Sequence, residues 1–442
     1  MTNRSIFLNS NLFFESTIKK NFDLITFYIG IFLLPSAFTI SLIFILFSII
    51  FSAFKYKQIY FNDKVNLIFL SACLVLFIST LSHLLWNNNI ANQTNWNSSF
   101  SLIGLANWIP LILTFIGSKP FLKTKELRKR FSIILLFGSI PVLFSCFSQY
   151  FLKWYGPYEI LNGLIVWYQK PLPNILGVTG LFNNQNYTSA WLNIIWPFAI
   201  SFFVISKKRK IIRFLIFFFL LSVFVFIILT GSRAGWIGMI CAIPLVFGSK
   251  AFKWFIPLIT FCLSFISSIV LPIFGEGYQI FMKTYIPSFV WINFSSKSYE
   301  DWDTSRLNIW QEAIKGINEN LFFGNGASSF SYFFEYQTNF WKGHAHNLPL
   351  ELAFSYGIPA TLLIIGPITF MVFKEFKNQY LNRKNISKEN IFEKAWLTSL
   401  IILICEHMVD IQYFDGRISL IAWLLLAGLR NMNQNSDLQE TF

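Results

Sequence analysis

The stretch that decides the fold is residues 211–248, IIRFLIFFFLLSVFVFIILTGSRAGWIGMICAIPLVFG, in which two long apolar runs meet at the polar break TGSR. An α-helix rises about 1.5 Å per residue, so about twenty apolar residues cross the hydrocarbon core of a bilayer. These residues therefore predict two membrane-spanning helices, with Arg233 at the point where one ends and the next begins.

The same composition extends along the whole chain. Of 442 residues, 55% are hydrophobic and 13% are charged, and 54 are phenylalanine. Soluble domains carry about 25% charged residues, so we predict an all-α polytopic membrane protein that forms a single integral membrane domain, 1–442. Cutting at the polar breaks gives about twelve transmembrane helices, with a long external loop before the tenth. The expected spans are 22–34, 37–54, 65–85, 102–117, 131–151, 187–206, 211–230, 234–248, 252–274, 347–373, 395–410 and 417–430. The first pair is equally compatible with one span kinked at Pro35.

The positive charge follows the apolar runs. The net charge is +14, and basic clusters such as KYKQ after Phe54 and KKRK before Ile211 fall in alternate short loops. Cytoplasmic loops are enriched in Lys and Arg, which places both termini in the cytoplasm and points to membrane lipids, not nucleic acid, as the partner of this charge. The five cysteines lie inside apolar runs without paired spacing, so no disulfide or thiolate metal site is expected. No cleavable signal pattern appears at the start, so the first span is expected to be retained.

Two external segments are long, about 152–186 and 275–345. The second contains SRLNIWQEAIKGINENLFFG, which predicts one amphipathic helix at about 305–320 and a stop at Gly324. We expect this helix, the only convincing one outside the membrane, to lie against the membrane face of the bundle. Its apolar positions at helical spacing are Leu307, Trp310, Ala313, Ile314 and Ile317.

His346 lies where this hydrophilic segment meets the apolar run after NLPLEL. A histidine at such a boundary can exchange protons with water and still work in a low dielectric, so it is the candidate catalytic base. A structural, hydrogen-bonded histidine is the alternative, and His344 is a more exposed competitor. Asn347 and Glu351 are possible supporting residues, and Glu351 could orient the imidazole. Further along, Glu406, His407, Asp410 and Arg417 could form an internal polar cluster.

Two arginines stand at expected helix starts. Arg233 follows Ser232, and Arg306 follows Ser305; serine is a favoured helix cap. A cation at a helix amino terminus is unfavourable unless an anion joins it, and the arginine fork bonds phosphate oxygens in pairs. The two could therefore clamp a pyrophosphate. The alternatives are a snorkelling interfacial arginine for Arg233, and a solvated arginine bridging to Asp303 or Glu312 for Arg306.

The pair Asp301 and Asp303 has the carboxylate spacing of metal-dependent glycosyltransferases. Its position directly before a predicted helix favours a capping role instead, and no metal or other cofactor is expected.

Four stretches between about Gly180 and Gly357 resemble the O-antigen ligase and polymerase superfamily of bacterial membrane glycosyltransferases. They are GLFNNQN, TGSRAGW, SRLNIWQEAIKGINENLFFGNGASSF and HNLPLELAFSYGIPA. The last resembles the ligase signature but carries Ala360 where Gly, Thr or Tyr is usual. The resemblance implies a twelve-span fold and metal-independent transfer of a glycan from a polyprenyl pyrophosphate carrier. It also implies that Arg233 and Arg306 hold the pyrophosphate, that His346 is catalytic, and that Asn186 has a structural or sugar-contact role.

We therefore expect an inverting, ligase-like glycosyltransferase of the inner membrane that transfers glycan to a lipid- or glycan-borne acceptor hydroxyl on the periplasmic face. An O-antigen polymerase or a protein O-oligosaccharyltransferase would differ mainly in the acceptor. From other classes, a small-anion transporter or a structural membrane scaffold remains an alternative.

Overall fold

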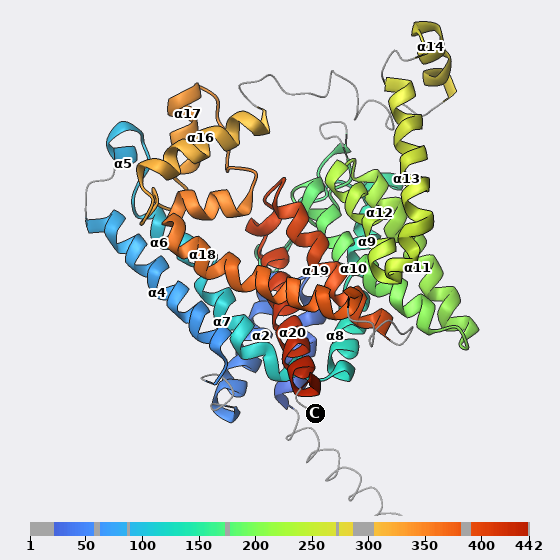
Figure 1. The fold of residues 1–442 in the computed structure, drawn as a ribbon, viewed down its shortest axis with the longest axis horizontal. Coiled ribbons are helices and arrows are strands. Elements are labelled where there is room, and N and C mark those ends of the chain that lie inside the picture. Colours follow the sequence, from blue (N-terminus) through green and yellow to red (C-terminus); the bar gives the residue numbers. More distant parts are fainter. Residues whose placement is uncertain are drawn as a thin grey trace, which may run out of the picture.

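The computed structural model describes residues 22–56, 62–85, 89–172, 177–270, 274–285, 305–381 and 390–440. In these ranges the chain is almost entirely helical (Figure 1). One antiparallel hairpin, β1 (Tyr158–Ile160) with β2 (Ile165–Trp167), lies in the segment 152–186.

The first half of the chain forms a short apolar helix, Phe22–Leu33, followed by α2 (Phe38–Lys55), α4 (Lys64–Leu85), α5 (Asn89–Gln93), α6 (Phe100–Leu105), α7 (Ile109–Ser118), the 3-10 helix η1 (Lys119–Leu122), α8 (Lys125–Gly138) and α9 (Ile140–Phe151). The second half forms α10 (Gln185–Ile205), α11 (Lys210–Leu229), α12 (Arg233–Phe247), α13 (Ser249–Val270), α14 (Glu276–Tyr285), α16 (Arg306–Glu319), α17 (Phe330–Thr338), α18 (Leu348–Phe376), η5 (Lys377–Leu381), α19 (Ile391–His407), η8 (Gln412–Phe414) and α20 (Gly416–Glu440).

Seven helical segments in the described ranges are long and apolar enough to cross a membrane, and three further apolar helices are shorter. The all-α architecture expected from the sequence is confirmed, whereas the count of twelve spans stays a prediction. The seven are Phe38–Lys55, Lys64–Leu85, Phe100–Leu122, Lys125–Phe151, Gln185–Ile205, Lys210–Leu229 and Leu348–Leu381.

The segment around Pro35 forms two helices rather than one kinked helix. Lys55, at the end of α2, reaches back to Asp23 at the start of the first helix with 3.2 Å between Nζ and Oδ2. The Ser41 hydroxyl donates to the Gly30 carbonyl oxygen at 2.7 Å. The two helices therefore run antiparallel. The helix breaks near Pro35 because proline removes a backbone donor and prevents a continuous helix through this point.

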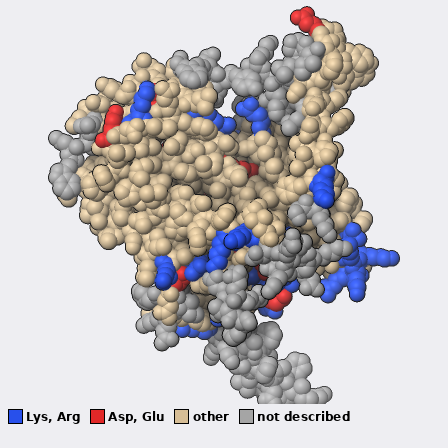
Figure 2. Space-filling view, viewed as in Figure 1, with Lys and Arg blue, Asp and Glu red and all other residues tan. Residues whose placement is uncertain are grey.

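Helix α11 shows how the outside of the bundle is built for lipid. It is apolar on every side, yet Ile211, Phe214 and Leu215 remain 78%, 61% and 62% exposed. A broad apolar surface of this kind marks contact with a membrane. Figure 2 shows a wide belt of uncharged residues across one face, with Lys and Arg gathered mainly along its lower part.

Helix α10 lies at the centre of the second half and packs on α11, α12 and α19. Two glycines of α12 allow the close approach: a Cβ on Gly235 would lie 1.6 Å from the Ser189 Oγ atom, and one on Gly238 would lie 2.7 Å from Asn193 Nδ2. The Asn193 amide donates to the Gly235 carbonyl oxygen (2.9 Å) and to Glu406 Oε1 (2.6 Å), tying all three helices together. The starts of α10 and α12 are thereby held beside the end of α19.

The segment 275–345 contains α16 at the place where the sequence predicts an amphipathic helix. Its buried apolar side chains are Ile309, Ala313 and Ile317, whereas Leu307 and Ile314 are 62% and 49% exposed. Gly316 decides this orientation, since a Cβ there would lie 2.3 Å from a ring carbon of Phe354 on α18. The prediction that Leu307 and Ile314 share the packed face is therefore wrong. The expectation of a single helix in this segment is also wrong, because α14 and α17 form there as well.

Candidate active site

His346 lies in the turn that leads into α18. Its backbone is left-handed, with φ at 49°, a conformation that usually costs a non-glycine residue about 1–2 kcal/mol. Its backbone N–H donates to His344 Nδ1 at 3.2 Å. The next residue, Asn347, caps α18 by accepting from the Leu350 N–H (3.0 Å) and donates to the Met408 carbonyl oxygen (3.0 Å). Asn347 thus fixes the histidine turn against the loop after α19.

The imidazole of His346 is hydrogen-bonded to the carboxylate of Asp410. The His346 Nδ1 and Asp410 Oδ1 atoms are 2.9 Å apart, and the two side chains are 24% and 11% exposed. The backbone N–H of Ile411 donates to the same carboxylate oxygen at 3.0 Å. The Asn186 amide donates to the other oxygen, Oδ2, at 2.8 Å. Segments that are far apart in the chain, the start of α10, the start of α18 and the loop after α19, therefore meet at one carboxylate.

The charge state of Asp410 determines which imidazole nitrogen is free. Burial of the carboxyl opposes ionisation, but the hydrogen bond from His346, together with the nearby His344 and Arg306 side chains, holds the pKa of Asp410 below its usual value. An ionised carboxylate only accepts hydrogen bonds, so the proton of the pair lies on His346 Nδ1. In a neutral imidazole held in this way the lone pair is on Nε2, as a general base requires.

His344 lies against His346, with 4.3 Å between the ring centroids. Burial, assisted by His346 and opposed by Asp410, lowers the pKa of His344 to about 4. His344 is therefore neutral at physiological pH and serves as an acceptor, and it is half-buried rather than exposed as the sequence suggested. Ligand atoms of His344, His346 and Asp410 lie within 4.8 Å of one another, a donor set that also suits a divalent transition metal.

Arg306 is the first residue of α16, where the Ser305 hydroxyl accepts from the Asn308 N–H at 3.3 Å. Its side chain is exposed, and its charge acts on Asp410. The alternative partner Glu312 is bonded to Lys315 instead, with 2.6 Å between Oε1 and Nζ. Asp301 and Asp303, the other carboxylates weighed for this region, lie outside the described residues.

Arg233 is the first residue of α12 and has an exposed side chain. Ser232 caps this helix, since its hydroxyl accepts from the Gly235 N–H at 3.4 Å. The close approach of Gly235 to Ser189 places the first turn of α12 beside the first turn of α10, which also carries Asn186. Arg233 therefore lies at the same end of the bundle as the Asp410–His346 pair.

The remaining acidic residues have other partners than the sequence suggested. Glu351 does not orient the imidazole; its Oε2 accepts from the Ala345 N–H at 2.8 Å and so holds the turn before His346. Glu406 bonds Asn193, and Arg417 forms two bonds to Asp415, at 2.9 and 2.5 Å. The predicted polar cluster of Glu406, His407, Asp410 and Arg417 is thus divided among separate partners, since His407 bonds Gln412 and Asp410 turns towards His346.

Residues 217–365, from within α11 to within α18, match the family model described as O-antigen ligase. This part of the chain is similar to the O-antigen ligase family. The match includes Arg233, Arg306 and His346 and confirms the resemblance seen in the sequence. No curated protein matches the chain. The match covers about a third of the chain and supports a glycosyltransferase-type enzyme of the membrane.

Proposed function

We propose that this O-antigen ligase family protein transfers a glycan from a polyprenyl pyrophosphate carrier to an acceptor hydroxyl, with His346 as the general base. The observation that carries the proposal is the hydrogen bond between His346 Nδ1 and the Asp410 carboxylate, which leaves Nε2 of the neutral imidazole to accept a proton, within the residues that match the family model. A general base whose orientation is fixed by a third group is a common arrangement for activating a nucleophile in enzymes.

In the proposed reaction, His346 Nε2 accepts the proton of the acceptor hydroxyl as that oxygen bonds to the anomeric carbon. The bond from this carbon to the pyrophosphate oxygen breaks, and the polyprenyl pyrophosphate leaves with its electron pair. A single displacement of this kind inverts the anomeric carbon. Asp410 stabilises the imidazolium that forms, and general-base help of this type contributes about 10² to 10⁴ in rate.

Arg233 and Arg306 are the proposed pyrophosphate ligands. Both are exposed and stand first in a helix, so their charge adds to the positive helix end and favours an anion. Negative charge on the pyrophosphate grows as the bond breaks, and both arginines then stabilise the transition state more than the ground state. No metal ion is needed in this scheme.

The site is proposed to face the periplasm. Helix α10 begins at the Asp410 site and ends at Ile205, directly before the basic run KKRK. Basic loops stay on the cytoplasmic side, so the opposite end of α10 faces outwards and both chain ends are placed in the cytoplasm.

The test uses purified protein in liposomes with a polyprenyl pyrophosphate-linked glycan, and it follows release of polyprenyl pyrophosphate and glycosylation of the acceptor. His346→Asn is the preferred variant, because asparagine tolerates the left-handed backbone at this position. His83→Asn is the matched control, since His83 lies on α4 and forms a hydrogen bond with the Phe323 carbonyl oxygen. We expect His346→Asn to abolish transfer without loss of folding and His83→Asn to retain it. Normal transfer by His346→Asn would remove the proposed base.

A ligase and a polymerase would both catalyse this reaction and would differ in the acceptor. A ligase deletion would leave long glycans on the carrier, whereas a polymerase deletion would leave single repeats there, so the carrier-bound glycans of a deletion strain distinguish the two.

A further inference from the structure

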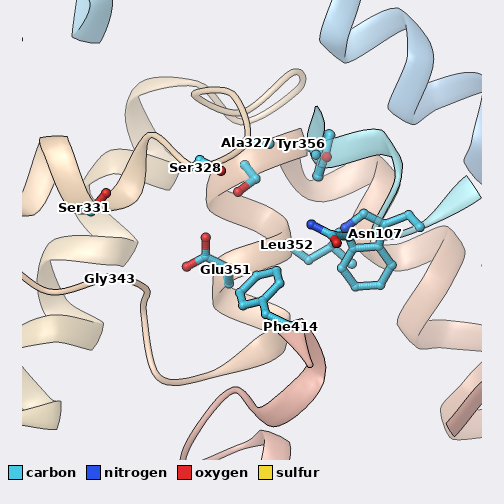
Figure 3. A pocket seen from close by; sticks show the side chains of 12 residues that line it. Asn107, Ala327, Ser328, Ser331, Gly343, Glu351, Leu352, Tyr356 and Phe414 are labelled. Atoms are coloured by element: carbon cyan, nitrogen blue, oxygen red, sulfur yellow. The ribbon is translucent and has the colours of Figure 1, made fainter. Parts of the chain in front are cut away.

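A cavity of about 160 Å³ opens beside the histidine turn (Figure 3). Its walls come from the turn between α6 and α7, from the segment before α17, and from the first turns of α18. The residues that the argument uses are Asn107, Trp108, Ser328, Ser331, Glu351 and Tyr356.

The cavity adjoins the proposed base. Glu351, which lines it, accepts from the backbone N–H of Ala345, the residue before His346. Phe414, another lining residue, has its ring centroid 6.2 Å from that of His344. The cavity therefore lies against the turn that carries His346.

The size of the cavity limits its occupant. An engineered protein cavity of about 150 Å³ holds one benzene molecule, so this volume suits a single six-membered ring and excludes a longer oligosaccharide. The lining contains the carboxylate of Glu351 and neither lysine nor arginine. A pyrophosphate would be repelled there, and the occupant is therefore not an anion.

The wall also contains polar groups that form no hydrogen bond with the described residues. The Tyr356 hydroxyl is buried without a hydrogen-bond partner among the described residues, and its residue is 2% exposed. In the same described part, the Asn107 amide and the hydroxyls of Ser328 and Ser331 have no hydrogen-bond partner. A buried polar group without a partner, such as the Tyr356 hydroxyl, is unfavourable by about 1–3 kcal/mol, which indicates a ligand that bears hydroxyl groups.

Aromatic residues complete the wall. Trp108 stacks on Tyr413 with 4.6 Å between ring centroids, and the Tyr413 hydroxyl donates to the Asn107 carbonyl oxygen at 2.8 Å. This fixes the backbone of Asn107 while its side-chain amide remains available. A mixture of rigid aromatic rings and a few convergent polar groups is typical of small-molecule sites.

We infer that this cavity is the subsite for the terminal pyranose of the acceptor, which presents its attacking hydroxyl to His346. The inference rests on the proposed function. In Figure 1, α18 and α19 lie between the group α5, α6, α16 and α17 on one side and α10 to α13 on the other. The acceptor ring would then approach from the first group, and the carrier pyrophosphate would approach Arg233 from the second.

The decisive variant is Tyr356→Phe, which removes only a hydroxyl that bonds no described residue. A single lost hydrogen bond of about 0.5–1.5 kcal/mol corresponds to a rise of about 2- to 10-fold in the acceptor KM. The donor KM should stay unchanged, and the thermal midpoint should not fall. Tyr28→Phe is the matched control, because Tyr28 also has a buried hydroxyl without a described partner but lies on the first helix, away from the cavity.

Binding without turnover tests the cavity separately. A panel of methyl hexosides and heptosides is offered to the detergent-solubilised protein, and saturation-transfer NMR reports binding. We expect binding to wild type, to Tyr28→Phe and to His346→Asn, with loss of at least threefold in affinity for Tyr356→Phe and Asn107→Ala. Equal binding to all variants, or none to wild type, would overturn the subsite. Failure of wild type to release polyprenyl pyrophosphate with any acceptor would overturn the proposed function instead.

Discussion

The contact between His346 and Asp410 leads to the sharpest prediction, which is the effect of Asp410→Asn. The asparagine oxygen can still accept from His346 Nδ1 and the Ile411 N–H, and Asn186 can rotate its amide to present an oxygen to the new NH₂ group. The geometry is therefore retained and only the negative charge is lost. The variant isolates the electrostatic contribution of Asp410 to the imidazolium that forms during transfer.

The magnitude follows from the distance and burial of the pair. Two unit charges about 4 Å apart at an effective dielectric constant of about 20 attract by about 4 kcal/mol. Both side chains are less than a quarter exposed, so solvent screening is limited. Each factor of ten in rate corresponds to about 1.4 kcal/mol, and we expect kcat to fall by about 10³-fold with the donor KM little changed.

The assay is the initial rate of polyprenyl pyrophosphate release per folded molecule, with folding measured by the thermal midpoint. Asp415→Asn is the matched control: this carboxylate lies in the same loop but bonds Arg417. It should lower the thermal midpoint while the rate per folded molecule is retained. If Asp410→Asn keeps kcat within about fivefold of wild type, Asp410 does not support an imidazolium and the proposed mechanism is refuted.

Three further outcomes are expected. Arg306→Lys should lower kcat at least about tenfold, because lysine cannot form the paired bonds of the guanidinium fork, and near-normal turnover would indicate a merely solvated arginine. His344 has a folded-state pKa of about 4, below its unfolded value of 6.5, so its contribution to stability is complete above pH 6.5 and is lost as the pH falls towards 4. This amounts to about 3 kcal/mol, so thermal midpoints measured across this range should fall more steeply for wild type than for His344→Gln. Transfer should persist in EDTA, whereas activity that is lost in EDTA and returns with Mn²⁺ or Zn²⁺ would assign the His344, His346 and Asp410 donors to a required metal.

Local signals in the sequence predicted much of the helical framework. Each of the expected spans has a helix over most of its length, because a long apolar run must satisfy its backbone hydrogen bonds internally. The starts of α12 and α16 were also predictable, since Ser232 and Ser305 lie directly before Arg233 and Arg306. Caps depend on neighbours a few residues away, and such neighbours can be read from the order of amino acids.

The partner of His346 could not be read in this way. Asp410 lies 64 residues further along the chain, and nothing in its local sequence distinguishes it from Glu406 or Asp415. The packing of α10 against α12 and α19 places the Asp410 carboxylate between Asn186 and His346. Glu406 and Asp415 have different partners.

The sequence by itself determined that this chain forms apolar helices with two arginines at helix starts and a histidine beside an apolar run, because those features depend on composition and short-range spacing. Only the tertiary structure decided which face of α16 is buried, which carboxylate holds the imidazole, and that a ring-sized polar cavity lies beside it. These choices depend on side-chain volumes and close contacts such as those at Gly235 and Gly316, where helices remote in sequence meet.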